Sequence, residues 1–276
     1  MREGEASMTA RRVAAHRLSF SREPCPWATS TQGADDDQRL QADVAAGVLV
    51  EPTPMAQYLQ ARTRFFDVVV VRSLDPGGDL GIDQAVSVGA GYDGRAQRYA
   101  RPSTRWFELD HPDTQSDKRA RLDELGIATP DATFVPAAFT VDDVGAALAR
   151  AGHDPTRPTL FTCEGVAGYL STDAIVSLLA ALGRVAAPGS RLAVTLPLEP
   201  ESAEERHRRG RLDAAVSTMG EPLASAIPRA ELGERLRASG WIVRRATDPA
   251  GVAIEQSPRS SAFVIAAPTE PPAETR

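Results

Sequence analysis

The feature that most constrains the fold of this chain is an apolar run that breaks into a glycine-rich turn at residues 85–95, AVSVGAGYDGR. Val86 and Val88 are β-branched residues suited to a buried strand. Gly89 and Gly91 remove side chains where a backbone turns sharply or lets a ligand approach closely. We predict a helix after the turn, so this stretch has the strand, turn and helix order of a ligand-binding α/β unit.

The next predicted strand, 105–110, ends in Asp110, about 20 residues beyond the turn, the spacing at which a carboxylate reaches a ribose hydroxyl. The glycines at 89–94 also match the dinucleotide fingerprint G-x-G-x-x-G. Asp93 argues against a dinucleotide, because its charge would oppose a pyrophosphate at the helix N-terminus. S-adenosylmethionine carries a sulfonium and an ammonium instead, so we expect it ahead of NAD or a flavin. A glycine turn without a ligand is the remaining interpretation.

Composition excludes several classes of function. A net charge of −6 gives no electrostatic reason to expect a nucleic acid partner. Cys25 and Cys163 lie far apart without metal-ligand spacing, which predicts no metal site and a reducing cytoplasmic location. No run approaches the roughly 20 apolar residues that cross a bilayer, and the N-terminus lacks an apolar signal region. We therefore expect a soluble protein with no membrane partner.

Strands and helices alternate along the chain, which predicts a parallel sheet covered by helices. After the strand at the glycine turn, the predicted parallel strands are 105–110, 132–138, 159–164 and 191–196. Two further strands, 241–247 and 261–267, are close enough in sequence to form an antiparallel pair. The predicted helices are 9–20, 43–50, 54–71, 112–125, 141–151, 171–187, 199–219 and 229–239, with a connecting loop at 21–37.

The helix at 54–71 carries a charged residue on its apolar side. Tyr58, Phe65, Phe66 and Val69 fall on one side at helical spacing, and Arg62 falls among them. The arginine needs a partner there. A ligand carboxylate, an ion pair within the fold and a side chain extended to solvent all remain open.

Four segments, taken together, resemble the leucine carboxyl methyltransferase family, including its bacterial members that methylate small molecules. The resemblance extends from about residue 54 to 267 and rests on ARTRFFD at 61–67, VGAGYDGR at 88–95, FELDHP at 107–112 followed by Lys118, and EGVAGYL at 164–170. It implies a Rossmann-like class I methyltransferase fold: a mostly parallel seven-stranded sheet with an antiparallel terminal pair and a helical cap. It also implies an N-terminal helical lid at 1–53 and an S-adenosylmethionine-binding domain at 54–276, with the cap inserted at about 198–230.

The resemblance also implies a role for each matching position. Arg62 would hold the methionine carboxylate of S-adenosylmethionine, and the backbone of Gly89, Ala90 and Gly91 would pass beneath the methionine. Asp110 would bind the ribose hydroxyls. Glu164 would face the donor's amino group or the substrate.

Three positions depart from the family pattern. Ala138 stands where relatives carry an acid that contacts adenine, which leaves the backbone amide of Phe139, or the side chain of Asp142, for that contact. Gly94 replaces a threonine and Gly168 a bulky residue. Both changes remove volume near the expected site, which either widens the acceptor site or weakens donor binding.

Methyl transfer from a sulfonium is an in-line displacement, and an ionised carboxylate acceptor needs no general base. A hydroxyl acceptor more often needs one. The few candidates are His16, Tyr92, His111 and Tyr169, and none stands out; His111, beside a proline, suits a structural turn. We therefore expect O-methylation of a small-molecule carboxylic acid. A hydroxyl acceptor, a protein C-terminal carboxylate and a non-catalytic binding module of the same fold are the alternatives.

Overall fold

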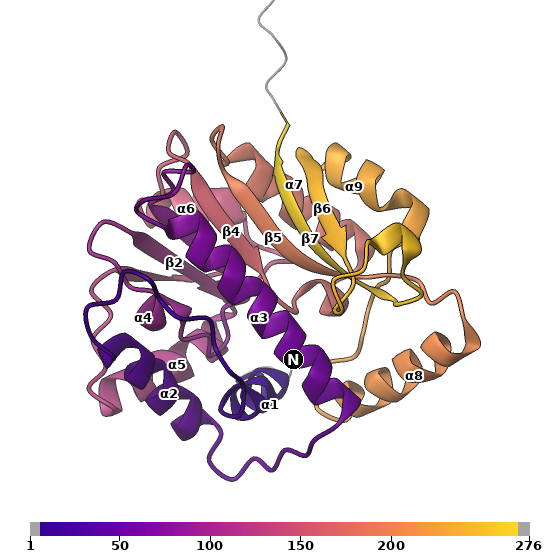
Figure 1. Cartoon of the computed structure of the whole chain (residues 1–276), viewed down its shortest axis with the longest axis horizontal. Helices are drawn as coiled ribbons and strands as arrows, with labels where there is room; N and C mark the ends of the chain where they lie inside the picture. The colour runs from indigo at the N-terminus through magenta and orange to yellow at the C-terminus, as the bar shows by residue number, and fades with distance from the viewer. Residues whose placement is uncertain (1–5, 270–276) are drawn as a thin grey trace, which may run out of the picture.

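The computed structural model describes residues 6–269, and these form a seven-stranded sheet in the order β3-β2-β1-β4-β5-β7-β6 (Figure 1). The strands are β1 (Gln84–Val88), β2 (Arg105–Asp110), β3 (Ala132–Pro136), β4 (Thr159–Cys163), β5 (Arg191–Pro197), β6 (Trp241–Thr247) and β7 (Ser261–Pro268). The first five strands are mutually parallel, whereas β7 runs antiparallel to both β5 and β6. The predicted α/β class and the antiparallel terminal pair are confirmed.

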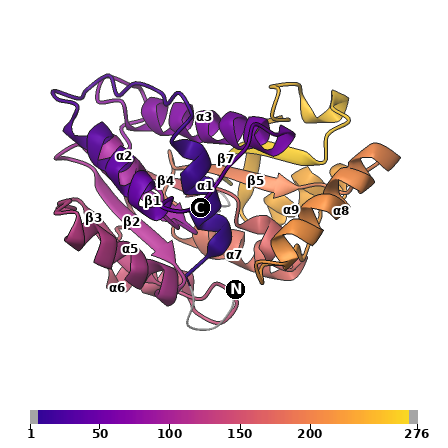
Figure 2. The ribbon, with the colours of Figure 1, turned by 90° about the horizontal axis from the view of Figure 1, so that it is seen from below.

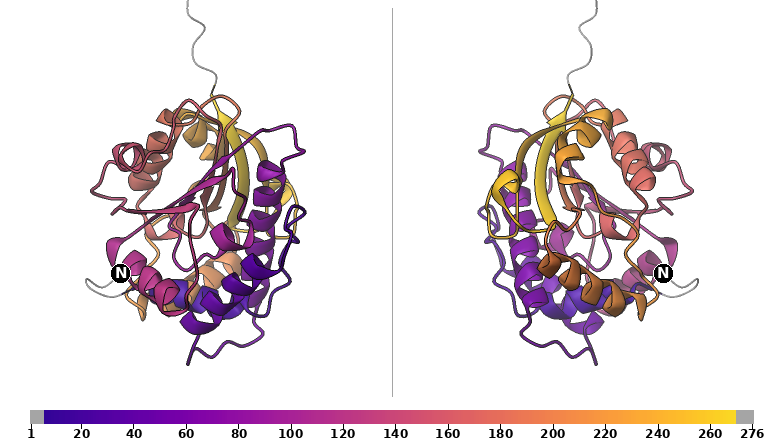
Figure 3. Two further views of the ribbon diagram at one scale, coloured as in Figure 1. Left: turned by 90° about the vertical axis from the view of Figure 1, so that its left-hand side faces the viewer. Right: turned by 90° about the vertical axis from the view of Figure 1, so that its right-hand side faces the viewer.

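Helices cover both faces of this sheet (Figure 3). They are α1 (Met8–Arg17), α2 (Gln32–Val44), α3 (Pro54–Leu74), α4 (Arg95–Arg98), α5 (Pro112–Glu124), α6 (Val144–Arg150), α7 (Thr172–Arg184), α8 (Ala203–Ser217) and α9 (Leu232–Ala238), with short 3-10 turns η1 (Ala167–Tyr169), η2 (Arg229–Glu231) and η3 (Ile254–Gln256). None of the helices within residues 6–269 is long and apolar enough to span a membrane.

The strands alternate side chains between two apolar cores, as the pleat requires. On one face, Ala85 of β1 packs with Phe66 and Val70 of α3. On the other face, Val86 of β1 packs with the buried side of α7, including Leu178. Burial of β1 on both faces explains why its sequence is a continuous apolar run rather than an alternating one.

A third group of helices lies at the carboxyl ends of the parallel strands (Figure 2). Ala14 of α1, Leu40 and Val44 of α2 and Leu122 of α5 form a small core around Tyr92, which follows β1. The strand order reverses here: β2 and β3 are added on one side of β1, and β4 and β5 on the other. Open α/β sheets bind their ligands outside such a switch point.

The N-terminal region differs from its sequence-based prediction. The loop expected at 21–37 is right only as far as Thr31, and the helix expected at 43–50 is wrong, because α2 begins at Gln32 and ends at Val44. Gly33 lies in the first turn of α2, where a Cβ would collide with the backbone oxygen of Gln97, so this glycine lets α2 approach α4. The helix after the glycine turn, α4, has only four residues.

Candidate active site

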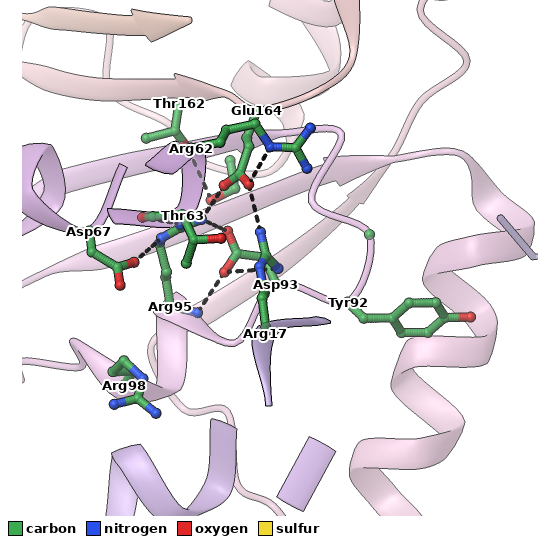
Figure 4. Close-up of polar contacts among 12 residues, drawn as sticks. Arg17, Arg62, Thr63, Asp67, Tyr92, Asp93, Arg95, Arg98, Thr162 and Glu164 are labelled. Carbon is green, nitrogen blue, oxygen red and sulfur yellow. Dashed lines mark hydrogen bonds and ion pairs between the residues drawn. The ribbon is translucent and has the colours of Figure 1, made fainter. Parts of the chain in front are cut away.

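Four of the predicted site elements come together at the switch point between β1 and β4, where the strand order reverses. We call them the switch-point cluster: Arg62 on α3, the turn Gly89–Gly91 after β1, Asp110 at the end of β2 and Glu164 after β4. Figure 4 shows Arg62 and Glu164 in contact beside the turn. Residues more than 100 positions apart in sequence therefore form one site because parallel strands end at the same edge.

The glycine turn has a backbone that other residues rarely adopt. Gly89 has φ of 65° and Gly91 has φ of 51°. The Gly89 and Ala90 amides donate to the carbonyl of Leu109 at 2.8 and 3.0 Å, which fixes the turn against β2. A Cβ on Gly89 would collide with Val166, and one on Gly91 would lie 3.2 Å from the Cβ of Ala10. Glycine at positions 89 and 91 therefore leaves the room that Val166 and Ala10 occupy.

Lys118 supports the same turn. Its buried Nζ donates to the carbonyl oxygen of Asp93 at 2.6 Å and to the carboxylate of Glu108 at 2.5 Å. Both side chains of this ion pair are almost fully buried. The lysine that follows the FELDHP segment thus acts on the turn's backbone.

Asp110 is a half-buried carboxylate held by backbone amides. Its Oδ2 accepts from the amide of Gly91, and its Oδ1 accepts from the amide of His111 at 2.6 Å. Burial raises the pKa of Asp110, and these two amides partly offset that rise. The geometry joins the end of β2 to the glycine turn, which aims the carboxylate at the turn.

Arg62 contacts Glu164 through only one side of its guanidinium. Nε donates to Oε1 at 2.9 Å, whereas within residues 6–269 no hydrogen-bond acceptor contacts Nη1 or Nη2. Figure 4 shows both Nη groups on the side away from Glu164. Gly165 permits this position, because a Cβ there would lie 2.7 Å from Nη1. The internal ion pair that the sequence left open exists, and the two Nη groups remain able to bind an anion.

Glu164 is surrounded by three guanidinium groups. Besides Arg62, Oε1 lies 3.0 Å from Nη2 of Arg17, and Oε2 accepts from Nη1 of Arg95 at 2.6 Å. Burial opposes ionisation of Glu164, but Arg17, Arg95 and Arg62 more than compensate and hold its pKa well below the usual value. Glu164 is thus an anion throughout the physiological pH range.

Arg95 continues this network away from Glu164. Its Nη1 lies 2.6 Å from Asp93 and its Nε 2.8 Å from Asp67. Asp67 in turn binds Arg22, whose Nη1 reaches Asp37 at 2.8 Å. Arg95 thus pairs with neighbouring carboxylates on two of its nitrogens. The network connects the chain before α2 to the switch-point cluster.

Arg17, Arg22 and Asp37 were not identified from the sequence as members of the site. Arg17 follows Ala14, Ala15 and His16 in α1, and all four side chains are buried. An arginine on the same side of a helix as small apolar residues was the available signal. Local spacing does not reveal the partner of Arg17, because Glu164 lies about 150 positions away.

The charge argument from Asp93 needs correction. The carboxylate is not free to repel a phosphate, because Oδ2 pairs with Arg95 and Oδ1 accepts from the Arg95 amide at 3.0 Å. The pKa of Asp93 is lowered, because Arg95 and Arg17 outweigh the effect of burial. The preference for S-adenosylmethionine over a dinucleotide therefore does not follow from this residue.

The region expected near adenine lies beside the glycine turn. The ring of Phe139 would be 3.8 Å from a Cβ on Gly89. Asp142 does reach back, but its carboxylate accepts from the amide of Ala138 at 2.7 Å rather than from that of Phe139. The Ala138 amide thus has a partner, and the Phe139 amide remains the predicted donor to the adenine ring.

The candidate bases are held in other contacts. His111 caps α5, where its Nδ1 accepts from the amide of Asp113 at 3.3 Å, so its structural role is confirmed. Tyr92 points away from the switch-point cluster (Figure 4) and donates to Asp117 at 2.5 Å. Burial raises the pKa of Tyr169, whose hydroxyl contacts Thr9, and lowers that of His16. Neither tyrosine is therefore ionised near neutral pH.

Solved structures place this architecture in the class I methyltransferase fold. A protein of the DUF574 family from Streptomyces avermitilis superposes with a TM-score of 0.61 at 16% identity, covering 97% of this chain and 99% of that one. A candidate methyltransferase from Thermobifida fusca superposes with a TM-score of 0.60 at 17% identity, covering 97% of both chains. At such identities the likeness shows the fold alone.

The sequence places the chain within a family. The family model described as leucine carboxyl methyltransferase matches residues 13–183, and the chain belongs to this family. A Mycolicibacterium vanbaalenii protein, by name a candidate S-adenosyl-L-methionine-dependent methyltransferase, is 32% identical over 261 residues, covering 85% of this chain and 84% of that protein. A Mycobacterium avium protein of the same name is 38% identical over 173 residues, which cover 62% of this chain and 54% of that protein. The chain thus matches about half the length of the latter.

Proposed function

We propose that this protein is an S-adenosylmethionine-dependent O-methyltransferase whose acceptor is the carboxylate of a small molecule. The observation that carries the proposal is the switch-point cluster, in which the free Nη groups of Arg62 and the half-buried carboxylate of Asp110 flank the glycine turn. Membership of the leucine carboxyl methyltransferase family supports the same reading.

The residues present fit such a donor. Arg62 offers two N–H groups to its methionine carboxylate, Glu164 offers an ionised carboxylate to its ammonium, and Asp110 offers its carboxylate to the ribose hydroxyls. When bound, the donor supplies a methyl group, and transfer forms an oxygen–carbon bond while the carbon–sulfur bond breaks and sulfur keeps the electron pair.

A carboxylate acceptor suits the groups around the site. It is ionised at neutral pH and needs no proton removed. The tyrosines near the cluster hold their protons, as their raised pKa values indicate. Arg17, Arg62 and Arg95 place three guanidinium groups around the site, with Glu164 as the carboxylate they share.

We further propose that the residues before α3 form a lid, with α8 as the cap inserted after β5. Ala10 of α1 lies against Gly91, and the amide of Met8 donates to Glu221, beyond α8, at 3.0 Å. The lid would exclude water from the reacting groups, which favours an in-line displacement.

The proposal is tested with donor labelled in its methyl group. The purified protein is incubated with labelled S-adenosylmethionine and a series of carboxylic acids, each paired with an alcohol or phenol of similar size. A methyl ester releases labelled methanol in mild base, whereas a methyl ether retains its label. We expect base-labile label from the acids only.

Base-stable label would show that the acceptor is a hydroxyl and would contradict the carboxylate assignment. Label recovered only on an added peptide with a free C-terminus would identify a protein carboxyl methyltransferase. Donor binding with no transfer to any acceptor in the series would favour the binding module.

A further inference from the structure

The three arginines around Glu164 are not equally well paired. Arg95 also contacts Asp67 at 2.8 Å and Asp93 at 2.6 Å. Arg17 has Glu164 at 3.0 Å, and its next carboxylate, Asp93, lies 3.9 Å away. Its Nε is buried and, among residues 6–269, has no hydrogen-bond partner. Arg17 thus has Glu164 as its one close carboxylate, whereas Arg95 has three.

The proposed donor would change the partners of Glu164. Oε1 already receives both Arg17 and Arg62. An ammonium group placed on the same carboxylate would compete with them, because like charges on one buried anion repel. Arg62 would gain the donor's carboxylate in exchange. Arg17 would gain nothing and would keep only Asp93, at 3.9 Å, as the partner of a buried cation, which is costly.

We propose that Arg17 is the residue that binds the acceptor's carboxylate, an inference that rests on the proposed function. The donor brings a sulfonium and an ammonium but only one carboxylate, so an anionic acceptor restores the charge balance beside Arg17. The side chain is only 7% exposed and extends from α1 to the end of β4, next to the cluster. Donor and acceptor therefore bind in a favourable order, with the donor freeing Arg17 for the acid.

A guanidinium at this position would distinguish the acceptor's free carboxylate from the methyl ester that is the product. Methylation converts the carboxylate into a neutral ester, which no longer pairs with a guanidinium. Arg17 then returns to Glu164 as the donor product leaves. The substrate class that follows is a free carboxylic acid, and esters or amides of the same size are excluded.

Binding of S-adenosylhomocysteine tests this without turnover, because it has the donor's ammonium and carboxylate. It is titrated calorimetrically into the protein in sodium acetate, in sodium chloride of equal ionic strength, and in chloride with methyl acetate. We expect acetate to tighten binding about fivefold or more, and methyl acetate to have no effect. In Arg17→Gln, S-adenosylhomocysteine should bind at least as tightly as to wild type in chloride, with no acetate effect.

Arg12→Gln is the matched control, because Arg12 lies on the same helix but is exposed, and it should keep the acetate effect. Arg17→Lys, which keeps the charge but loses the planar fork, should keep part of it. Wild-type protein that binds S-adenosylhomocysteine without any acetate effect would overturn the role of Arg17, as would an undiminished effect in Arg17→Gln. Failure of the wild type to bind S-adenosylhomocysteine at all would instead overturn the proposed function.

Discussion

Arg95→Met should destabilise the protein by about 3–5 kcal/mol, the usual cost of removing one partner from a buried ion pair. The side chain of Arg95 is 1% exposed and contacts the carboxylates of Asp67, Asp93 and Glu164. Its loss leaves these anions close together, with less positive charge to offset their burial. The change in unfolding free energy is measured by urea denaturation, followed by circular dichroism.

Arg39→Met is the control for this variant. Arg39 also pairs with an aspartate, Asp36, but its side chain is 47% exposed, so its loss should cost less than about 1 kcal/mol. If Arg95→Met is as stable as Arg39→Met, the buried network does not hold α3 and the glycine turn together.

Gly89→Ala should cost about 2–4 kcal/mol, from two separate effects. The backbone has φ of 65°, which an L-residue adopts at a cost, and the new Cβ would collide with Cγ2 of Val166. Urea denaturation of Gly89→Ala, Val166→Ala and the double variant separates these effects. The double variant should recover part of the loss, because Val166→Ala removes the colliding atom.

Gly81→Ala provides the matched control. Gly81 has φ of 58°, but a Cβ there would meet no atom within 4 Å. It should therefore show the backbone cost alone, about 1–2 kcal/mol. Equal losses in Gly81→Ala and Gly89→Ala would contradict the close packing of Val166 on the turn.

Local patterns predicted most of the sheet and the positions of the cluster. The prediction for β2 matches its observed bounds, because apolar residues there end at a carboxylate beside a proline-started helix. Gly89 and Glu164 directly follow β1 and β4, and Asp110 is the last residue of β2, so the fold class alone places them at one edge. These features depend on contacts between neighbouring strands and on short-range chemistry.

The partners of the charged residues could not be predicted in the same way. Asp93 and Arg95 are two positions apart and pair locally, yet Arg95 also pairs with Glu164, which follows β4. The start of α2 was missed because Gly33 is required by contact with α4 rather than by a turn. Both depend on tertiary packing, which one sequence does not encode in local spacing.

The most direct test of the central claim is calorimetric titration of the folded protein with S-adenosylhomocysteine, with NAD as the comparison ligand. We expect binding near micromolar Kd for S-adenosylhomocysteine and none for NAD. Asp110→Ala should weaken the binding of S-adenosylhomocysteine by about 10- to 100-fold, the loss expected for hydrogen bonds to a charged group. A folded wild-type protein that binds NAD, or that binds S-adenosylhomocysteine equally well with and without Asp110, would contradict the assignment of the switch-point cluster as the donor site.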